Sequence, residues 1–171
     1  MKPSIWNFPT RIVFGAGVVA SLSDEAKRVG MQRPLIVTDT GLVGTGVVER
    51  VASALRAAGL QVGVFSGVLG NPTEANIQAG AEAYREHQAD GVVALGGGSP
   101  LDAGKLVALR AVSERPFEEL DDALGGDRYI PPNVPPIITV PTTAGTGSEV
   151  GRSGVVTVMS TGPWRISYVS D

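Results

Sequence analysis

The chain has 171 residues, with 14 Lys and Arg against 17 Asp and Glu, one His and no Cys. This length is typical of one domain, and 43% hydrophobic against 18% charged residues predicts a packed core and excludes a disordered chain. Without Cys there are no disulfides, thiolate metal sites or Cys nucleophile, and a single His excludes any site that needs two.

Charge and hydropathy also bear on partners and location. A net charge of -3 on a mixed surface gives no electrostatic footprint for nucleic acid. No apolar run approaches the roughly 18 residues of a membrane span, and the first residues lack a signal-peptide core. We therefore expect a cytoplasmic protein without nucleic acid or membrane partners.

Short β-branched runs alternate with Ala-rich helical stretches, a pattern that predicts βα units stacked into a parallel sheet. Continuous apolar runs indicate strands covered on both faces, and apolar residues at three- and four-residue steps indicate helices. The predicted strands are 34–38, 61–65, 91–95 and 137–140, with a weaker one at 154–157, and the predicted helices are 44–58, 73–88 and a third that begins at Ser99.

Three segments lie outside this alternation. Segment 6–14 is predicted to be an N-terminal edge strand or hairpin packed on the sheet. Segment 113–136 is rich in acidic residues and Pro, which predicts a surface excursion. Segment 158–171 shows neither a clear helix nor a closing strand. The expected fold class is therefore α/β, a Rossmann-like parallel sheet flanked by helices.

A predicted strand runs through Gly96, Gly97 and Gly98 directly into the helix that starts at Ser99. Free backbone N–H groups and the positive end of a helix then lie at one spot, which suits a phosphate or diphosphate. Ser99 is predicted to be the N-cap, with Pro100 in the first helical position and Asp102 reaching back to the cap. An ordinary turn is the alternative, but three consecutive glycines exceed what a turn needs.

The second informative turn follows the strand 137–140. It reads Pro-Thr-Thr-Ala-Gly-Thr-Gly-Ser-Glu over residues 141–149 and offers hydroxyls and backbone donors at the carboxyl end of the sheet, where open α/β folds bind ligands. Thr and Gly also gather in ordinary loops. This run occurs together with the turn at Gly96, Gly97 and Gly98, which we call the glycine turn, and the pair favours the functional interpretation.

Two further positions carry weaker signals. Asp39 follows a strand end, where nucleotide-binding folds place a carboxylate on a ribose hydroxyl, although a helix cap is the alternative. His87 is predicted to be a solvated surface residue near a helix end.

These motifs are similar to those of the iron-containing (group III) alcohol dehydrogenase family. The resemblance rests on Gly96 to Pro100 with Asp102 and Lys105, and on the run 141–149. Shorter matches at 14–17, 37–39 and 71–73 occur in the same order and spacing, and the resemblance covers about residues 5 to 157. It implies the N-terminal nucleotide-binding domain of an enzyme that interconverts alcohols with aldehydes or ketones using NAD or NADP.

The resemblance also implies which residues contact the cofactor. Residues 97–102 would line the diphosphate, and residues of the run 141–149 would line the nicotinamide side. Asp39 and Asn71 would contact the adenosine half, and Val155 would lie along the cofactor. The residues are Asp39, Asn71, Gly97, Gly98, Ser99, Pro100, Leu101, Asp102, Thr142, Thr143, Gly145, Thr146 and Val155. Asp39 favours NAD over NADP, because a carboxylate repels a 2′-phosphate at close range.

Family members continue into an all-helical domain in which an Asp and three His hold iron or zinc. That domain is absent here, and His87 does not replace it. The family also has a basic residue, usually Lys, in this region, and the residue of this chain that corresponds to it by the resemblance is Arg165. We therefore expect a dinucleotide-binding domain over 1–157, a divergent or truncated tail over 158–171, and no catalytic or metal-binding residue in this chain.

Two kinds of function stay open at this point. The first is the cofactor-binding half of an NAD(P)-dependent alcohol dehydrogenase, inactive by itself, whose partner is a small alcohol or aldehyde. The second is a non-catalytic nucleotide-binding or vestigial module, whose exposed apolar face would promote self-association. A glycerol dehydrogenase-like enzyme is a further alternative, although Ser99-Pro100 and the run 147–149 favour the alcohol dehydrogenase branch. Homo-oligomerisation is left open.

Overall fold

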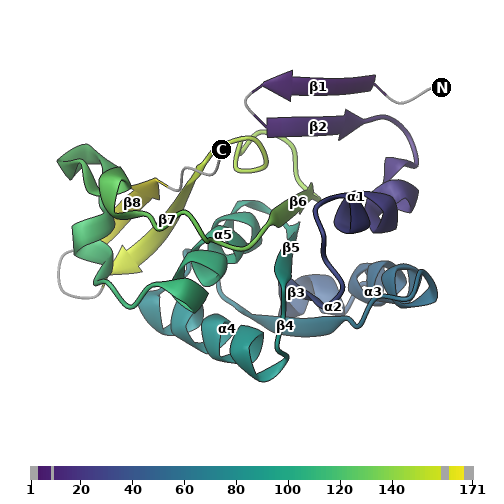
Figure 1. The fold of residues 1–171 in the computed structure, drawn as a ribbon, viewed down its shortest axis with the longest axis horizontal. Coiled ribbons are helices and arrows are strands. Elements are labelled where there is room, and N and C mark those ends of the chain that lie inside the picture. Colours follow the sequence, from purple (N-terminus) through teal and green to yellow (C-terminus); the bar gives the residue numbers. More distant parts are fainter. Residues whose placement is uncertain (1–3, 9, 159–161, 168–171) are drawn as a thin grey trace.

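A computed structural model describes residues 4–8, 10–158 and 162–167 of the chain. It contains a four-stranded parallel sheet with helices on both faces and two separate antiparallel hairpins (Figure 1). The α/β, Rossmann-like fold class predicted from the sequence is confirmed.

The elements follow the predicted alternation. Strands of the parallel sheet are β3 (Pro34–Asp39), β4 (Gly63–Val68), β5 (Gly91–Gly96) and β6 (Ile137–Pro141). Helices are α1 (Leu22–Arg28), α2 (Thr40–Val43), α3 (Val47–Ala57), α4 (Glu74–Glu86) and α5 (Gly98–Val112), with the short 3-10 turns η1 (Val18–Ser21), η2 (Phe117–Leu120), η3 (Asp122–Leu124) and η4 (Gly126–Tyr129). The hairpins are β1 (Ser4–Phe8) with β2 (Thr10–Phe14), and β7 (Ser153–Val158) with β8 (Gly162–Ser167).

The strand order of the sheet, β4-β3-β5-β6, contains a reversal. From β3 the chain crosses to β4 on one side and then returns to β5 on the other side. Open α/β sheets bind ligands at such a switch point, outside the carboxyl ends of the strands. Asp39 at the end of β3 and Gly96 at the end of β5 flank that point.

Two apolar cores fill the two faces of the sheet. Alternate residues of a strand point to opposite faces, so Val37 packs with α4 and α5 while Ile36 packs with α1 and α3. Every residue of β5 is buried, as expected for a strand covered on both sides. The predicted surface excursion 113–136 contains η2, whose Phe117 and Leu120 are buried in the core against α5.

Helix α5 is the central element of the molecule. It packs against β3, β5 and β6 of the sheet on one side and against β7 on the other. Ten of its residues are buried, which includes the charged Lys105 and Arg110. A helix that is buried on all sides carries apolar residues around its whole circumference, so its sequence shows little amphipathic periodicity.

The N-terminal segment forms a hairpin, β1-β2, which was one of its two predicted forms, and this hairpin is a sheet of its own and not an edge of the parallel sheet. Several other local predictions were wrong. The region after residue 158 contains strand β8, where no strand was predicted. Helices η1 and α1 were not predicted, and the predicted helix 44–58 begins only at Val47, after the separate turn α2.

His87 also differs from its prediction as a solvated residue. It is half-buried at the end of α4, where its Nε2 atom lies 2.9 Å from the carbonyl oxygen of Gln61. Its ring contacts Gly63, because a Cβ at that glycine would lie 2.8 Å from the ring. The imidazole therefore joins α4 to the start of β4.

Candidate functional site

The two glycine-rich turns lie side by side at the carboxyl edge of the sheet. Strands β5 and β6 are neighbours, with Gly96 paired to Pro141. The N–H of Thr142 donates a hydrogen bond to the carbonyl oxygen of Gly96 at 2.8 Å. Two segments that are more than forty residues apart in the sequence are thereby brought to one place.

The contact between these turns depends on the missing side chains of the glycines. A Cβ at Gly97 would lie 3.0 Å from Oγ1 of Thr143. A Cβ at Gly98 would lie 3.2 Å from Cγ2 of Thr146. Contacts this short are tighter than ordinary van der Waals separation. Larger residues at these two positions would therefore push the loop 142–147, which we call the threonine loop, away from the glycine turn.

Helix α5 begins earlier than predicted. Its first residue is Gly98 and its N-cap is Gly97, so Ser99 is not the cap and Asp102 does not reach back to one. Gly97 makes no side-chain capping bond, and Gly98 and Ser99 have no intrahelical acceptor for their N–H groups. These donors therefore stay available at the positive end of the helix, as an anionic ligand requires.

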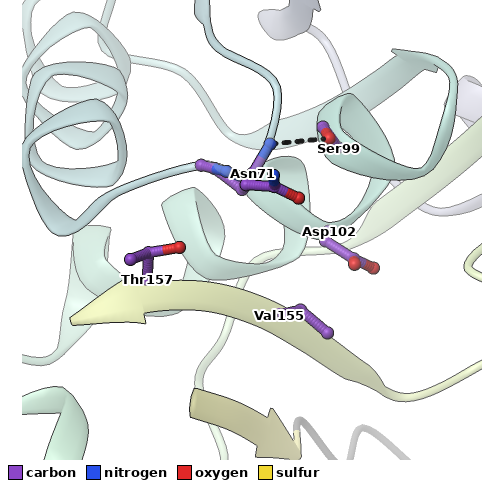
Figure 2. A pocket seen from close by; sticks show the side chains of 6 residues that line it. Asn71, Ser99, Asp102, Val155 and Thr157 are labelled. Carbon is purple, nitrogen blue, oxygen red and sulfur yellow. Dashed lines mark hydrogen bonds between the residues drawn. The ribbon is translucent and has the colours of Figure 1, made fainter. Parts of the chain in front are cut away.

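A pocket of about 300 Å³ lies beside the first turns of α5. Figure 2 shows it between α5, the segment after β4 and strand β7. Its lining residues are Asn71, Pro72, Ser99, Asp102, Val155 and Thr157. Four of these six, Asn71, Ser99, Asp102 and Val155, are among the predicted cofactor-binding residues.

Pro72 and Thr157 were not among the predicted site residues. The N–H of Thr157 donates a hydrogen bond to the carbonyl oxygen of Pro72 at 2.8 Å, which joins β7 to the segment after β4. Val155 and Thr157 point to the pocket, whereas Val156 and Val158 are buried in the core. The two-residue period of a strand would have indicated Thr157 once Val155 was assigned.

Asp39 lies at the same edge and has two neighbours. One carboxylate oxygen, Oδ1, accepts a hydrogen bond of 2.8 Å from the N–H of Leu42 and caps α2. The other, Oδ2, lies 3.5 Å from where a Cβ of Gly96 would be. The helix-cap interpretation is thus confirmed, and the second oxygen faces the glycine turn.

The remaining predicted residues are placed around the pocket and not in its lining. Residues 142–147 form an exposed loop, which includes Thr142, Thr143, Gly145 and Thr146. Pro100 and Leu101 are buried, Pro100 beneath Gly96 and Leu101 in the core beside α4. Their side chains therefore support the glycine turn from below.

Among the described residues, no three His, Asp or Glu side chains are grouped so that they could hold a metal ion. The described residues thus do not fit the iron or zinc that the family resemblance implies. None of the described helices is long and apolar enough to cross a membrane.

Comparison with known proteins identifies the family of this chain. The model of the family described as iron-containing alcohol dehydrogenase matches residues 9–171. This chain is a member of the iron-containing alcohol dehydrogenase family. The match continues to residue 171, so the resemblance extends beyond residue 157, where it was expected to end.

Individual relatives agree in fold and sequence. A 4-hydroxybutyrate dehydrogenase of Cupriavidus necator is 44% identical over 86% of this chain and 38% of its own length. A crystal structure of a 1,3-propanediol oxidoreductase superposes with a TM-score of 0.83 at 36% identity, over 91% of this chain and 40% of that one. A sulfoacetaldehyde reductase from Bifidobacterium kashiwanohense, solved in complex with NAD+, gives 0.79 at 32% identity, over 91% and 40%. The chain therefore spans about two fifths of the length of these relatives.

Proposed function

We propose that this chain binds NAD and provides the cofactor-binding half of an alcohol dehydrogenase. One observation carries the proposal: the open helix N-terminus of α5, the glycine turn and the pocket meet at the switch point of a parallel sheet. The structure of the related sulfoacetaldehyde reductase with NAD+ supports the choice of ligand.

The residues of this chain would hold the cofactor in a defined way. The N–H groups of Gly98 and Ser99 would donate to the diphosphate, which their position at a helix N-terminus favours. Asp39 would accept the ribose hydroxyls of the adenosine half through Oδ2, since Oδ1 is used by Leu42. Its negative charge favours NAD over the 2′-phosphate of NADP.

The threonine loop and the pocket would orient the rest of the cofactor. Thr142, Thr143, Gly145 and Thr146 would lie along the nicotinamide side, while Val155 and Thr157 would exclude water from one side of the dinucleotide. A nicotinamide cofactor supplies the hydride acceptor or donor for interconversion of an alcohol and its aldehyde or ketone. The described residues contribute binding and orientation, and we derive no step through a metal ion from them.

The whole protein would act on a small alcohol or aldehyde in the cytoplasm. Dinucleotide binding by residues 1–157, with residues 158–171 as a tail, is the domain division that goes with this proposal. Self-association through an exposed apolar face stays a prediction, which sedimentation velocity of the purified chain would test.

Titration of the chain with NADH, followed by nucleotide fluorescence, tests the proposal. Gly97 has an extended backbone with φ of -77°, which a larger residue also adopts, so Gly97→Val should fold. Its side chain would collide with Thr143 and cover the neighbouring N–H groups, and we expect NADH affinity to fall by about tenfold or more.

Gly70→Ala is the matched control, because a Cβ there meets nothing within 4 Å. We expect it to bind NADH like the wild type. Absence of saturable NADH binding by the wild type, or equal binding by Gly97→Val, would contradict the proposal.

A further inference from the structure

A buried lysine joins α5 to β7 beneath the pocket. Lys105 lies in the second turn of α5 and is only 3% exposed. Its Nζ atom donates a hydrogen bond of 2.8 Å to the carbonyl oxygen of Ser153, the first residue of β7. The same atom lies 3.6 Å from Oδ1 of Asp102, which lines the pocket.

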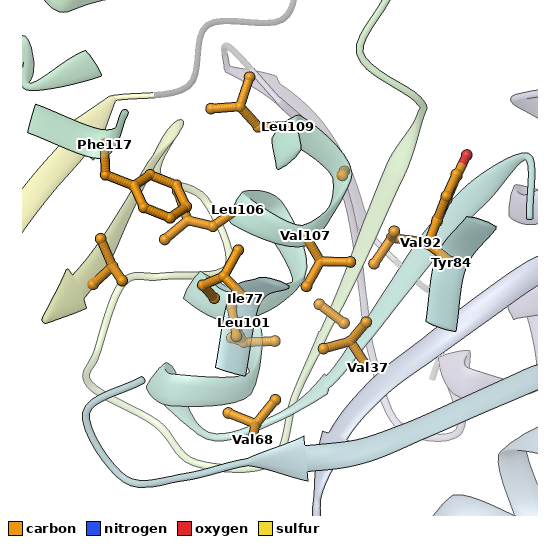
Figure 3. Packing of buried hydrophobic residues seen from close by; sticks show 14 of the residues in the cluster. Val37, Val68, Ile77, Tyr84, Val92, Leu101, Leu106, Val107, Leu109 and Phe117 are labelled. Carbon is orange, nitrogen blue, oxygen red and sulfur yellow. The ribbon is translucent and has the colours of Figure 1, made fainter. Parts of the chain in front are cut away.

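The backbones of the two elements approach closely at this place. A Cβ at Gly154 would lie 2.9 Å from Cγ of Leu106 and 3.0 Å from the carbonyl oxygen of Asp102. Leu106 and Phe117 lie in the apolar core that surrounds this part of α5 (Figure 3). The hydrogen bond from Lys105 is therefore one of the contacts that set the position of β7, and with it that of Val155.

Two carboxylates act on this ammonium group. Asp102 is in direct contact with it, and Glu149, the last residue of the run 141–149, acts on it through its charge. The Oε2 atom of Glu149 is buried and has no hydrogen-bond partner in the described part of the chain. Burial lowers the pKa of Lys105, while the charges of Asp102 and Glu149 act in the opposite direction and favour its charged form.

Asp102 lines the pocket beside the place where the diphosphate is proposed to bind, and Glu149 follows Ser148, whose Oγ lies 3.6 Å from where a Cβ of Gly98 would be. Two negative groups near that place would repel an anionic ligand, and the repulsion is strong where water is excluded. Lys105 itself is too buried to contact the ligand, and its ammonium already donates to Ser153.

We propose that Lys105 is a positioning residue of the cofactor site. Its ammonium holds Asp102 and the start of β7 in place and offsets the carboxylates of Asp102 and Glu149, so that an anionic diphosphate binds at the glycine turn. This inference rests on the proposed NAD-binding function.

The test compares two probes that differ in charge. Adenosine is neutral, whereas ADP-ribose carries the diphosphate, and each is measured by displacement of fluorescent NADH. Lys105→Met keeps the length of the side chain and removes its charge. We expect it to lower the affinity for ADP-ribose by about tenfold. Adenosine affinity should change by less than about twofold.

A second variant separates charge from packing. Glu149→Gln removes the second carboxylate without shortening the side chain. In the Lys105→Met background it should restore ADP-ribose affinity by about threefold or more, and alone it should raise that affinity by about twofold. If circular dichroism shows Lys105→Met to be unfolded, the effect of Glu149→Gln alone decides the question.

Lys27→Met is the matched control. Lys27 is exposed near the end of α1, and Met31 just after it packs on Gly91 at the amino end of β5, so this lysine lies at the opposite edge of the sheet. It should bind both probes like the wild type.

The outcomes are distinguishable. If the wild type does not bind NADH, the proposed function is wrong and this inference falls with it. If the wild type binds NADH and Lys105→Met binds ADP-ribose with equal affinity, only the proposed role of Lys105 is overturned, and the proposed function stands. Equal loss of both probes without recovery by Glu149→Gln would show a purely structural lysine and would also overturn it.

Discussion

The backbone N–H of Asn71 donates a hydrogen bond to the side-chain oxygen of Ser99 at 3.3 Å (Figure 2). It links the segment after β4 to the first turn of α5 across the pocket. Asn71 has a positive φ of 55°, a backbone conformation that few residues other than Gly and Asn adopt. The geometry of this turn is therefore specific to its residue, and the Ser99 bond helps to hold it.

Removal of this bond should affect binding more than stability. Ser99→Ala deletes the acceptor, while the exposed N–H of Asn71 regains water, so the free energy of unfolding should change by less than about 1 kcal/mol. With the pocket wall less ordered, we expect NADH affinity to fall by about threefold to tenfold in a fluorescence titration. Ser53→Ala on the exposed side of α3 should leave affinity unchanged. Loss of stability without loss of affinity would contradict this role.

Asp39 should determine the choice of cofactor through its charge. In Asp39→Asn the side-chain oxygen still caps α2, because Asn is as good an N-cap as Asp. The lost charge should raise NADPH affinity relative to NADH by about tenfold, measured by parallel titrations. A parallel fall in affinity for both cofactors would indicate that the carboxylate does not discriminate between them.

The N-terminal hairpin should be attached to the body in a pH-dependent way. Hydrogen bonds from Arg11 of β2 and from Arg28 lower the pKa of Glu25 from 4.5 to about 2. A carboxylate with a lowered folded pKa contributes stability above pH 4.5 and loses it as the pH falls toward 2.

Glu25→Gln should therefore be less stable than the wild type at pH 7, by about 1 kcal/mol because these ion pairs are partly exposed. Urea unfolding at several pH values would measure the difference, which should vanish as the pH approaches 2. A difference that is constant with pH would show that the charge of Glu25 is not its cause.

Gly80 should be required for the contact between α4 and α5. A Cβ there would collide with Cγ2 of the buried Val107. Ala favours a helix over Gly by about 1 kcal/mol, but overpacking a core costs about 1 to 3 kcal/mol, so the collision should dominate. Gly80→Ala should therefore lower the free energy of unfolding by about 1 to 2 kcal/mol.

Urea denaturation of a double-mutant cycle checks the cause. Val107→Ala removes the obstructing carbon but leaves a cavity, so it is destabilising alone. In the double variant the new methyl group occupies part of that space. The double variant should therefore lose less free energy of unfolding than the two single variants lose in sum. An additive loss would mean that the two residues do not collide.

Regular elements were predictable where one local rule dominated. The strands β3 and β5 are continuous apolar runs, and they were predicted to within one residue. The capping box of Thr73 and Asn76 starts α4 at the expected place. The start of α5 was misplaced because Gly97 acts as the cap, and the preference for Ser at that position indicated Ser99 instead.

The site was predictable in its chemistry but not in its extent. The glycine turn and the threonine run carry local signals, and the family resemblance connected them. Thr157 and Pro72 carry weaker signals, because a threonine in a strand and a proline in a turn are common. Thr157 is indicated only by the strand period from Val155, and Pro72 only by its place between Asn71 and Thr73. The buried role of Lys105 was not predictable, because nothing near it in the sequence indicates Ser153 as its acceptor.

By itself, the sequence determined the α/β class, the order of the strands along the chain and the two turns that a nucleotide would meet, since these follow from residue patterns within short windows. Only the tertiary structure decided that β5 and β6 are neighbours, that β7 closes the pocket and that Lys105 is sealed beneath it. The physical reason is that these relationships join residues about forty or more positions apart, and packing against the whole sheet, which no local pattern encodes, brings them together.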